Sequence, residues 1–290
     1  ANTTGTQNTA VGKDAGLSLT TATYTTLIGA FAGDAITTGT FNTAVGGASL
    51  TANTTGANNT AVGTSALASN STASNNTALG FEALATNSTG HTNVAVGALA
   101  LDANTTGNYN IALGVNALTA NTTAADNIAI GTSALGANTT GTNNVAVGQN
   151  ALDAVTTSNN NIAIGLDTLS GAAGNQNVAI GTDGQKVSTA ANNTSVGYLA
   201  LAANTTGGSN TAVGGVSLDA NTEGDSNTAM GYAALTANTT ADSNTAIGYA
   251  AMQTNTTGYE NTAVGRSALN ANTTGFRNQG FGTNSLLANT

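Results

Sequence analysis

The stretch Asn59-Thr60-Ala61-Val62-Gly63 decides the fold, because copies of it recur along the whole chain. Read as Asn-x-Ala-aliphatic-Gly, the unit occurs seventeen times in 290 residues, and successive copies begin 17 residues apart except for two steps of 16 residues. A period this regular predicts a repeat architecture that grows by stacking. The copies begin at Asn8, Thr25, Asn42, Asn59, Asn76, Asn93, Asn110, Asn127, Asn144, Asn161, Asn177, Asn193, Asn210, Asn227, Asn244, Asn261 and Asn278.

The constrained positions of the repeat become visible when the first residue of each copy is numbered as position 0. Position 0 is Asn in every copy except the one at Thr25, and position 2 is mostly Ala. Position 3 is always apolar, position 4 is always Gly, and position 8 is mostly Leu. Positions 11 to 14 commonly read Asn-Thr-Thr-Gly, as in residues 53–56. The apolar positions lack helical spacing, so two short extended segments separated by turns are the better interpretation.

Each repeat therefore predicts one coil of an all-β fold, a parallel β-solenoid or β-roll of about seventeen coils. We expect a single repeat domain over residues 1–290, which is a fragment or processed part of a longer fibre chain because it begins and ends inside a repeat. The Gly at position 4 is interpreted as a corner that needs a positive φ or a close backbone approach. These corner glycines are Gly12, Gly29, Gly46, Gly63, Gly80, Gly97, Gly114, Gly131, Gly148, Gly165, Gly181, Gly197, Gly214, Gly231, Gly248, Gly265 and Gly282.

Asn at positions 0 and 11 suits turns, and identical Asn side chains stacked along a solenoid can form amide ladders. The Asn-x-Thr sequons at position 11, such as Asn53 and Asn104, are interpreted as ladder residues, with glycosylation of some left open. The coils from Thr25, Asn161 and Asn177 depart from the pattern, and we expect a local bulge or kink, or a functional loop, in each. The predicted Asn ladder comprises Asn42, Asn59, Asn76, Asn93, Asn110, Asn127, Asn144 and Asn161.

Composition excludes several classes of function. Only 6% of the residues are charged and the formal net charge is −9, with four basic residues, so we expect no nucleic-acid partner. No run of 18 apolar residues exists, so we expect no membrane span. The absence of Cys rules out disulfides and thiolate chemistry. The single His, His91, lies in a turn without an evident catalytic partner, so we expect neither enzymatic activity nor a cofactor.

Alternation along the strand predicts an apolar face outside the coil. Positions 1 and 3 point one way and position 2 the other. One face must fill the interior with the Leu at position 8, and the other lies outside. A long exposed apolar stripe is typical of an interface, so we expect the chain to associate with itself. Position 1 is Thr in the outer coils but aliphatic in the middle ones, at Val94, Ile111, Ile128, Val145, Ile162 and Val178.

Two further groups of side chains are candidate sites. Tyr232 and Tyr249 share position 5 of adjacent coils and are followed there by Arg266. Such a stack could bind a sugar, or it could simply stabilise the turn.

Two pairs of acidic residues occupy equivalent positions in neighbouring coils, Asp167 with Asp183 and Asp225 with Asp242. Each pair should lie about 5 Å apart. They are weak candidates for a Ca²⁺ site, and solvated, mutually repelling carboxylates are the alternative.

The sequence Asn-Thr-Ala-Val-Gly, followed by Ala-Leu and then Asn-Thr-Thr-Gly, resembles the head repeats of trimeric autotransporter adhesins, whose period is shorter. It is also similar to repeats in phage tail-fibre-like and bacterial surface fibre proteins. The resemblance covers the whole chain. It implies a left-handed β-roll, three chains side by side, an extracellular, cell-surface or virion-surface location, and a host-surface glycan or protein as a further partner.

We therefore expect an extracellular structural or adhesive fibre segment that associates with itself along the apolar face into a trimeric or filamentous rod. A phage tail-fibre shaft is one alternative. An ice-binding solenoid is another, because the Asn-Thr-Thr columns would present regular Thr arrays.

Overall fold

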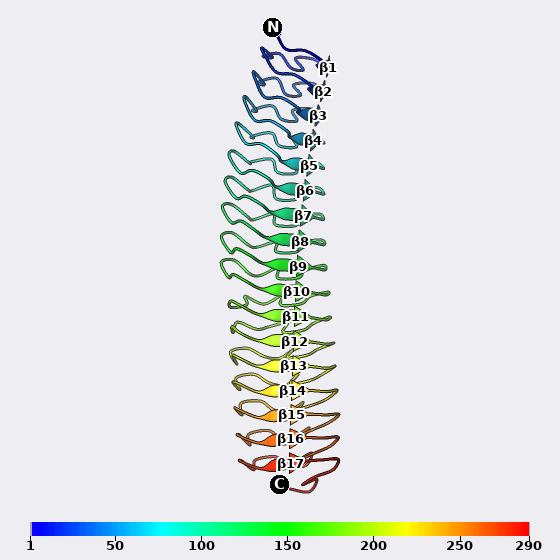
Figure 1. Cartoon of the computed structure of the whole chain (residues 1–290), viewed down its shortest axis with the longest axis vertical. Coiled ribbons are helices and arrows are strands. Elements are labelled where there is room, and N and C mark those ends of the chain that lie inside the picture. The colour runs from blue at the N-terminus through cyan, green and yellow to red at the C-terminus, as the bar shows by residue number, and fades with distance from the viewer. Residues whose placement is uncertain (1, 290) are drawn as a thin grey trace. The chain divides into compact units, whose positions relative to one another are not determined.

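The computed structural model describes residues 2–289, which form a parallel β-solenoid with one short strand in each coil and no helix (Figure 1). The chain divides into two compact units, residues 1–144 and 145–290. The first unit contains β1 (Thr9–Val11), β2 (Thr26–Ile28), β3 (Thr43–Val45), β4 (Thr60–Val62), β5 (Thr77–Leu79), β6 (Val94–Val96), β7 (Ile111–Leu113) and β8 (Ile128–Ile130). The second contains β9 (Val145–Val147), β10 (Ile162–Ile164), β11 (Val178–Ile180), β12 (Thr194–Val196), β13 (Thr211–Val213), β14 (Thr228–Met230), β15 (Thr245–Ile247), β16 (Thr262–Val264) and β17 (Gln279–Phe281). The predicted all-β solenoid class is confirmed.

Within each unit, neighbouring strands pair in parallel so that equal repeat positions face one another. Ala95 in β6, for example, pairs with Ala112 in β7. The Val94 N–H donates to the Asn110 carbonyl of the next coil at 2.9 Å, and the Gly97 N–H donates to the Leu79 carbonyl of the preceding coil at 2.8 Å. This register stacks each column of the sequence repeat into a column of side chains in space.

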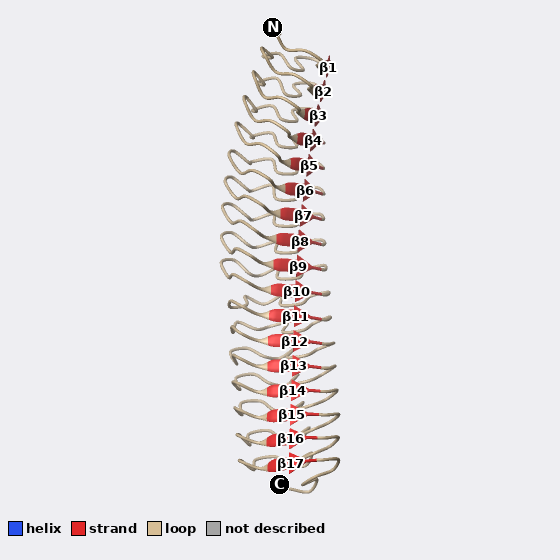
Figure 2. Ribbon diagram, in the orientation of Figure 1, coloured by secondary structure: helices blue, strands red, loops and turns tan. Residues whose placement is uncertain are grey.

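Each coil has only one extended segment, so the prediction of two such segments is wrong (Figure 2). The Ala-Leu stretch after the corner is instead a turn in which positions 6 and 8 are left-handed, as in Glu82 with φ 53° and Leu84 with φ 55°. Left-handed backbone costs a non-Gly residue roughly 1–2 kcal/mol. Stacking offsets this cost, because the Glu82 N–H donates to Thr64 O of the preceding coil and the Leu84 N–H to Ala100 O of the following coil, both at 3.0 Å.

The interior is filled by small apolar side chains and one Leu per regular coil. Ala95 at position 2, Ala100 at position 7 and Leu101 at position 8 are fully buried. The rest of the interior is polar, because Asn93 and Asn104, at positions 0 and 11, are also fully buried. Buried polar groups must be hydrogen-bonded, so the fold depends on where these amides find partners.

The corner glycines behave as predicted. All seventeen have a positive φ, for example 130° at Gly97 and 136° at Gly63. A Cβ on Gly97 would lie 2.5 Å from the carbonyl oxygen of Gly114 in the next coil. Both requirements of a corner, the conformation and the close approach, are therefore present at the same residue.

The coil from Thr25 contains no bulge or kink, contrary to prediction. Strand β2 pairs in uninterrupted register with β1 and β3. Its interior is instead rebuilt: Leu27 takes the usual place of Ala, Gly33 that of Leu, and Ile36 that of the position-11 Asn. A Cβ on Gly33 would lie 2.7 Å from Ile36 Cδ1 and 2.8 Å from Leu27 Cδ2, so the two large side chains fill the space that Leu vacates. Thr25 itself donates its N–H and its hydroxyl to Asn8 Oδ1.

The two 16-residue coils also keep their strand register, with Ala163 paired to Ala179 and Ala179 to Ser195. The residue that each coil lacks is removed from the turn after position 8, so the predicted bulge is absent from the strands here as well. Gln185 replaces the interior Leu and is fully buried. Its Nε2 donates to Val178 O and to Ser195 Oγ, both at 3.0 Å.

Candidate functional site

The outward face of the strands is a candidate interaction surface, which we call the outer face and define as repeat positions 1 and 3. Position 2 is the inward position, since Ala112 and Ala129 are fully buried. Aliphatic side chains occupy both outward positions in β6 to β8 of the first unit and in β9 to β11 of the second. Ile130 in β8 and Ile164 in β10 remain 37% and 38% exposed. Within each unit, the position-3 side chains of this face are exposed or partly exposed among the described residues, and the position-1 side chains, such as Ile111 and Ile128, are mostly partly exposed.

The predicted aromatic patch is assembled as expected at position 5 of the second unit. The rings of Tyr232 and Tyr249 stack with centroids 5.8 Å apart and an interplanar angle of 15°. The Arg266 guanidinium lies 5.9 Å from the Tyr249 ring centroid, a cation–π distance. Tyr198, two coils before Tyr232, is 58% exposed.

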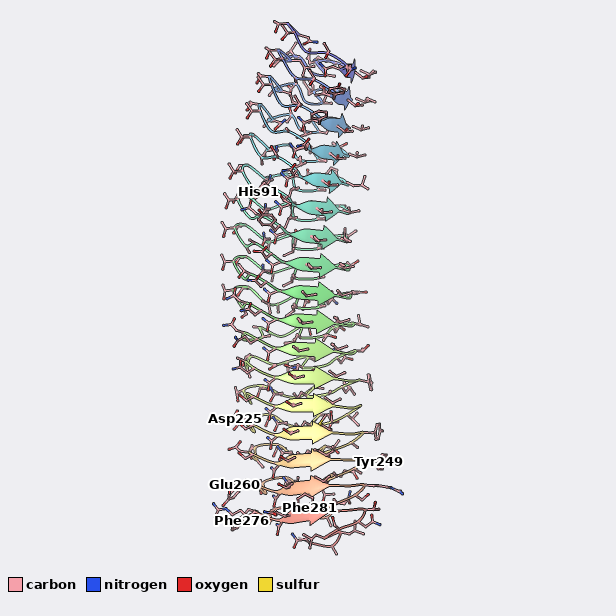
Figure 3. All side chains as sticks on the ribbon, in the orientation of Figure 1. His91, Asp225, Tyr249, Glu260, Phe276 and Phe281 are labelled. Atoms are coloured by element: carbon pink, nitrogen blue, oxygen red, sulfur yellow. The ribbon has the colours of Figure 1, made fainter. Side chains whose placement is uncertain are left out.

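Figure 3 shows that Tyr249 projects from the edge of the coils at which the strands end. Asp225, Glu260 and Phe276 lie on the opposite edge. On that edge, a second aromatic stack joins Tyr259 and Phe276, with centroids 5.1 Å apart. The two aromatic columns of this unit are therefore separate features.

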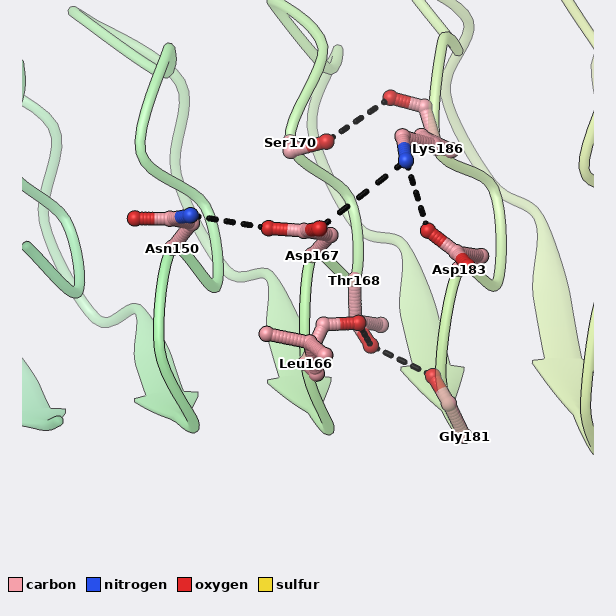
Figure 4. Close-up of polar contacts among 8 residues, drawn as sticks. All are labelled: Asn150, Leu166, Asp167, Thr168, Ser170, Gly181, Asp183 and Lys186. Atoms are coloured by element: carbon pink, nitrogen blue, oxygen red, sulfur yellow. Dashed lines mark hydrogen bonds and ion pairs between the residues drawn. The ribbon is translucent and has the colours of Figure 1, made fainter.

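The first pair of candidate metal ligands is bridged by a lysine (Figure 4). Lys186 Nζ lies 2.7 Å from Asp183 Oδ1 and 3.9 Å from Asp167 Oδ2. The hydrogen bond from Lys186 to Asp183 raises the pKa of the lysine. Asp167 Oδ1 also accepts a hydrogen bond from Asn150 Nδ2 at 2.9 Å. The alternative of bare repelling carboxylates is wrong for this pair, because the ammonium group occupies the place of a bridging cation.

The second pair binds backbone amides. Asp225 Oδ1 accepts the Gly208 N–H at 2.6 Å, and Asp242 Oδ1 accepts the Asp225 N–H at 2.7 Å. Each carboxylate is therefore committed to the backbone of the preceding coil. Among residues 2–289, no group of three or more His, Cys, Asp or Glu side chains is arranged to hold a metal ion.

Two other acidic residues, Asp153 and Asp219, have pKa values that are raised by burial. Burial raises the pKa of Asp219, and hydrogen bonds from its own N–H and that of Ala220 oppose the shift. Burial likewise raises the pKa of Asp153, with a smaller contribution from the nearby Asp167 charge. Both share repeat position 9 with Asp102, whose Oδ1 accepts the Thr119 hydroxyl at 2.7 Å.

The Asn residues form two kinds of ladder. At position 11 the amides bond to one another: Asn104 Nδ2 donates to Asn87 Oδ1 at 2.9 Å and to Gly107 O at 3.0 Å. At position 0 the partners are mainly backbone: Asn76 Oδ1 accepts the Asn93 N–H at 2.9 Å, and Asn93 Nδ2 donates to Gly107 O at 2.8 Å. The ladder predicted from Asn42 to Asn161 thus exists but runs mainly from side chain to backbone.

The position-11 amides of the inner coils are fully buried, as at Asn53 and Asn104, and their Nδ2 groups donate to the backbone inside the coil. The sequons at these residues therefore offer no accessible amide in the folded coil. Their interpretation as ladder residues is confirmed.

The two Thr columns differ in their hydrogen bonding. At position 12 the hydroxyl is used internally, since Thr105 Oγ1 donates to Thr122 O at 3.0 Å. At position 13 the side chains are exposed, as at Thr55 and Thr89. The ice-binding alternative rests on both Thr columns, but the hydroxyls of the position-12 column are used in hydrogen bonds that stabilise the turn.

Neither the bridging role of Lys186 nor the hydrogen bond between Gln185 and Ser195 was predicted from the sequence. A signal for the second existed, because Gln185 and Ser195 are both polar replacements in columns that are otherwise apolar.

Within residues 2–289, no helix is long and apolar enough to cross a membrane. Comparison with known proteins finds no family model that matches this chain and no curated protein that is significantly similar to it.

Proposed function

We propose that this chain is a structural segment of an extracellular fibre and that it associates with itself through the outer face, as a homotrimer. The observation that carries the proposal is the row of outward aliphatic side chains, in which Ile111 and Ile128 are partly exposed and Ile130 is 37% exposed. The outer face of the eight three-residue strands in the first unit covers on the order of 400 Å² at a coil spacing of about 4.8 Å. It is aliphatic at position 3 throughout and at both outward positions in β6 to β8. Patches of roughly this size on soluble proteins are often interaction sites.

A second copy of the same chain is the partner that fits this face best. The aliphatic rows repeat at the coil spacing, so another copy presents rows with the same spacing and can interdigitate along their whole length. Both outward positions of β6 to β8 are uncharged and lack hydrogen-bonding groups. They therefore favour a dry contact with an equally apolar surface. An extracellular location belongs to the same proposal and rests on the resemblance to adhesin heads and surface fibres.

The test exchanges aliphatic residues for Thr, which most other coils already carry at position 1. The triple variant Val94→Thr, Ile111→Thr, Ile128→Thr should keep the fold and lower the mass measured by multi-angle light scattering from three chains to one. A matched control changes three exposed residues in the turns. This control, Thr55→Ala, Thr72→Ala, Thr89→Ala, should remain trimeric.

A wild-type chain that is monomeric at the highest soluble concentration would overturn the self-association. Immunogold electron microscopy of the cells or virions that carry the protein tests the location, and labelling confined to the cell interior would contradict it.

A further inference from the structure

We infer that the position-5 column of the second unit binds an acidic glycan chain, with one sugar ring held between Tyr198 and Tyr232 over the backbone of Gly215. The inference is independent of self-association, because it uses a different column of side chains. It starts from the order of residues at position 5 in five consecutive coils, which is Tyr198, Gly215, Tyr232, Tyr249 and Arg266.

The spacing between the first two tyrosines suits a guest ring. Tyr198 and Tyr232 lie two coils apart, which is about 9.6 Å at the usual strand spacing. A sugar ring placed midway would lie about 4.8 Å from each aromatic ring. At that distance its C–H groups contact both ring faces by dispersion. By contrast, Tyr232 and Tyr249 occupy adjacent coils and stack directly on each other at 5.8 Å.

Gly215 leaves the gap open, and its backbone does not require glycine. Its φ is not positive, unlike that of the corner glycine before it, Gly214. The same repeat position is occupied by Thr64 and Thr132 in other coils. An atom placed where a Cβ would be at Gly215 lies 3.4 Å from Tyr232 Cδ2 and 3.7 Å from Cε2, which is van der Waals contact. The Tyr232 ring therefore lies against Gly215 and forms one wall of the gap, and no atom of the Tyr198 ring lies closer than 4.0 Å to the same point.

The basic side chain of Arg266 in this column indicates that the ligand is acidic. Of the three basic residues in this unit, Lys186 and Arg277 are paired with carboxylates. Arg266 has no carboxylate partner among the described residues and lies over Tyr249. It continues the stack three coils beyond Gly215, about 14 Å along the axis. A glycan chain that runs along the column can therefore place a carboxylate on Arg266.

A glycan fits better than a nucleic acid or a peptide. A nucleic acid is held mainly by many phosphate contacts to basic side chains, and this column has only one basic side chain, Arg266. Exposed Tyr side chains offer both an apolar ring face, which suits the C–H face of a sugar, and a hydroxyl that can bond to sugar hydroxyls. Tyr198, Tyr232 and Tyr249 are each more than half exposed, so an extended ligand can reach all three.

The experiment titrates the full chain with a tetramer of galacturonic acid and with the neutral tetramer of galactose. Binding is followed by isothermal titration calorimetry and by tyrosine fluorescence, which is readable because the chain has no Trp. We expect the acidic tetramer to bind with a Kd in roughly the millimolar range, as suits an open site with few contacts. Arg266→Gln should weaken binding of the acidic tetramer at least about fivefold and remove its salt dependence.

Gly215→Thr is the decisive variant, because it fills the gap with a side chain that other coils accept at this position. It should weaken binding at least about tenfold. Gly47→Thr is the matched control: it makes the same change at position 5 of a coil without aromatic neighbours there and should leave binding unchanged. Equal binding by wild type and Gly215→Thr would overturn the site. Failure of the acidic tetramer to bind, or equally tight binding of the neutral one, would overturn the ligand class.

Discussion

The coil from Thr25 and the coil from Asn93 build the same turn of solenoid from different interior residues. The regular coil uses Ala95, Leu101 and Asn104 at positions 2, 8 and 11, whereas the other uses Leu27, Gly33 and Ile36. Both pair with their neighbours in unbroken parallel register. The fold therefore constrains the total interior volume of a coil and the glycine at its corner, but not which residue occupies each inward position.

The largest expected effect comes from the feature that the two coils share. Gly97→Ala and Gly29→Ala should each destabilise by about 3–6 kcal/mol, from backbone strain of about 1–3 kcal/mol and the loss of several ladder hydrogen bonds. A Cβ on either residue would lie 2.5 Å from the corner carbonyl of the next coil. Urea denaturation followed by circular dichroism measures the loss. Gly47→Ala is the control, because its Cβ would meet nothing closer than 4.0 Å. If Gly97→Ala unfolds like this control, the corner is an ordinary turn.

The next effect tests volume compensation directly. Leu27→Ala alone should destabilise by about 3 kcal/mol, because Gly33 leaves no large side chain to fill the cavity. The triple variant Leu27→Ala, Gly33→Leu, Ile36→Asn restores the regular set of interior residues and should recover most of that loss. Asn53 would then gain a side-chain acceptor in the preceding coil, as Asn104 has in Asn87. A triple variant less stable than Leu27→Ala would show that the two interiors are not interchangeable.

A smaller loss is expected from the ladder that the coil from Thr25 lacks. Asn104→Ala should cost about 2 kcal/mol, because it leaves Asn87 Oδ1 without the amide that donates to it and Asn121 Nδ2 without its side-chain acceptor. Hydrogen exchange should show the loosening in the adjacent coils first. Thr106→Ala, at an exposed turn position two residues later, should change stability by less than about 0.5 kcal/mol. Equal effects of the two changes would mean that the ladder contributes nothing.

The smallest effect is a gain in stability that depends on pH. Burial raises the pKa of Asp219 above its usual value of 3.8, so the folded state disfavours the charged carboxylate. Stability is therefore greatest below that usual value and falls as the pH rises through the folded-state pKa. Asp219→Asn should raise the Tm slightly at pH 7 and leave it unchanged at pH 3. Asp102→Asn, which replaces a carboxylate that accepts the Thr119 hydroxyl, should bring no gain at pH 7. A gain for Asp219→Asn that is the same at both pH values would rule out ionisation as its cause.

The repeat period was sufficient to predict the solenoid, the parallel pairing and the corner glycines, because each depends on what recurs in a single column of the sequence. It could not predict the left-handed backbone at Leu84 and Leu101, since Leu disfavours that conformation and only stacking imposes it. The compensation in volume among Leu27, Gly33 and Ile36 was not predicted either, because it involves three different repeat positions and no single column of the repeat displays it.

For the candidate sites too, contacts within one column of the repeat were predictable and contacts between different columns were not. Tyr232, Tyr249 and Arg266 share one column, and the structure stacks them. The bridge from Lys186 to Asp167 and Asp183 joins different repeat positions, so reading down the columns could not reveal it.

The hydrogen bonds between Asn side chains and the backbone affect how readily these residues lose their amide groups. Asn limits the lifetime of many proteins at high temperature by losing its amide, a reaction in which the next backbone nitrogen attacks the side-chain carbonyl. At Asn93, the side-chain Nδ2 donates a hydrogen bond to Gly107 O. The attacking nitrogen would be that of Val94, and its N–H donates to Asn110 O. No Asn in the chain precedes a Gly, the neighbour that leaves this nitrogen most accessible. At Asn93 the folded coil therefore holds in hydrogen bonds both nitrogens that this reaction involves.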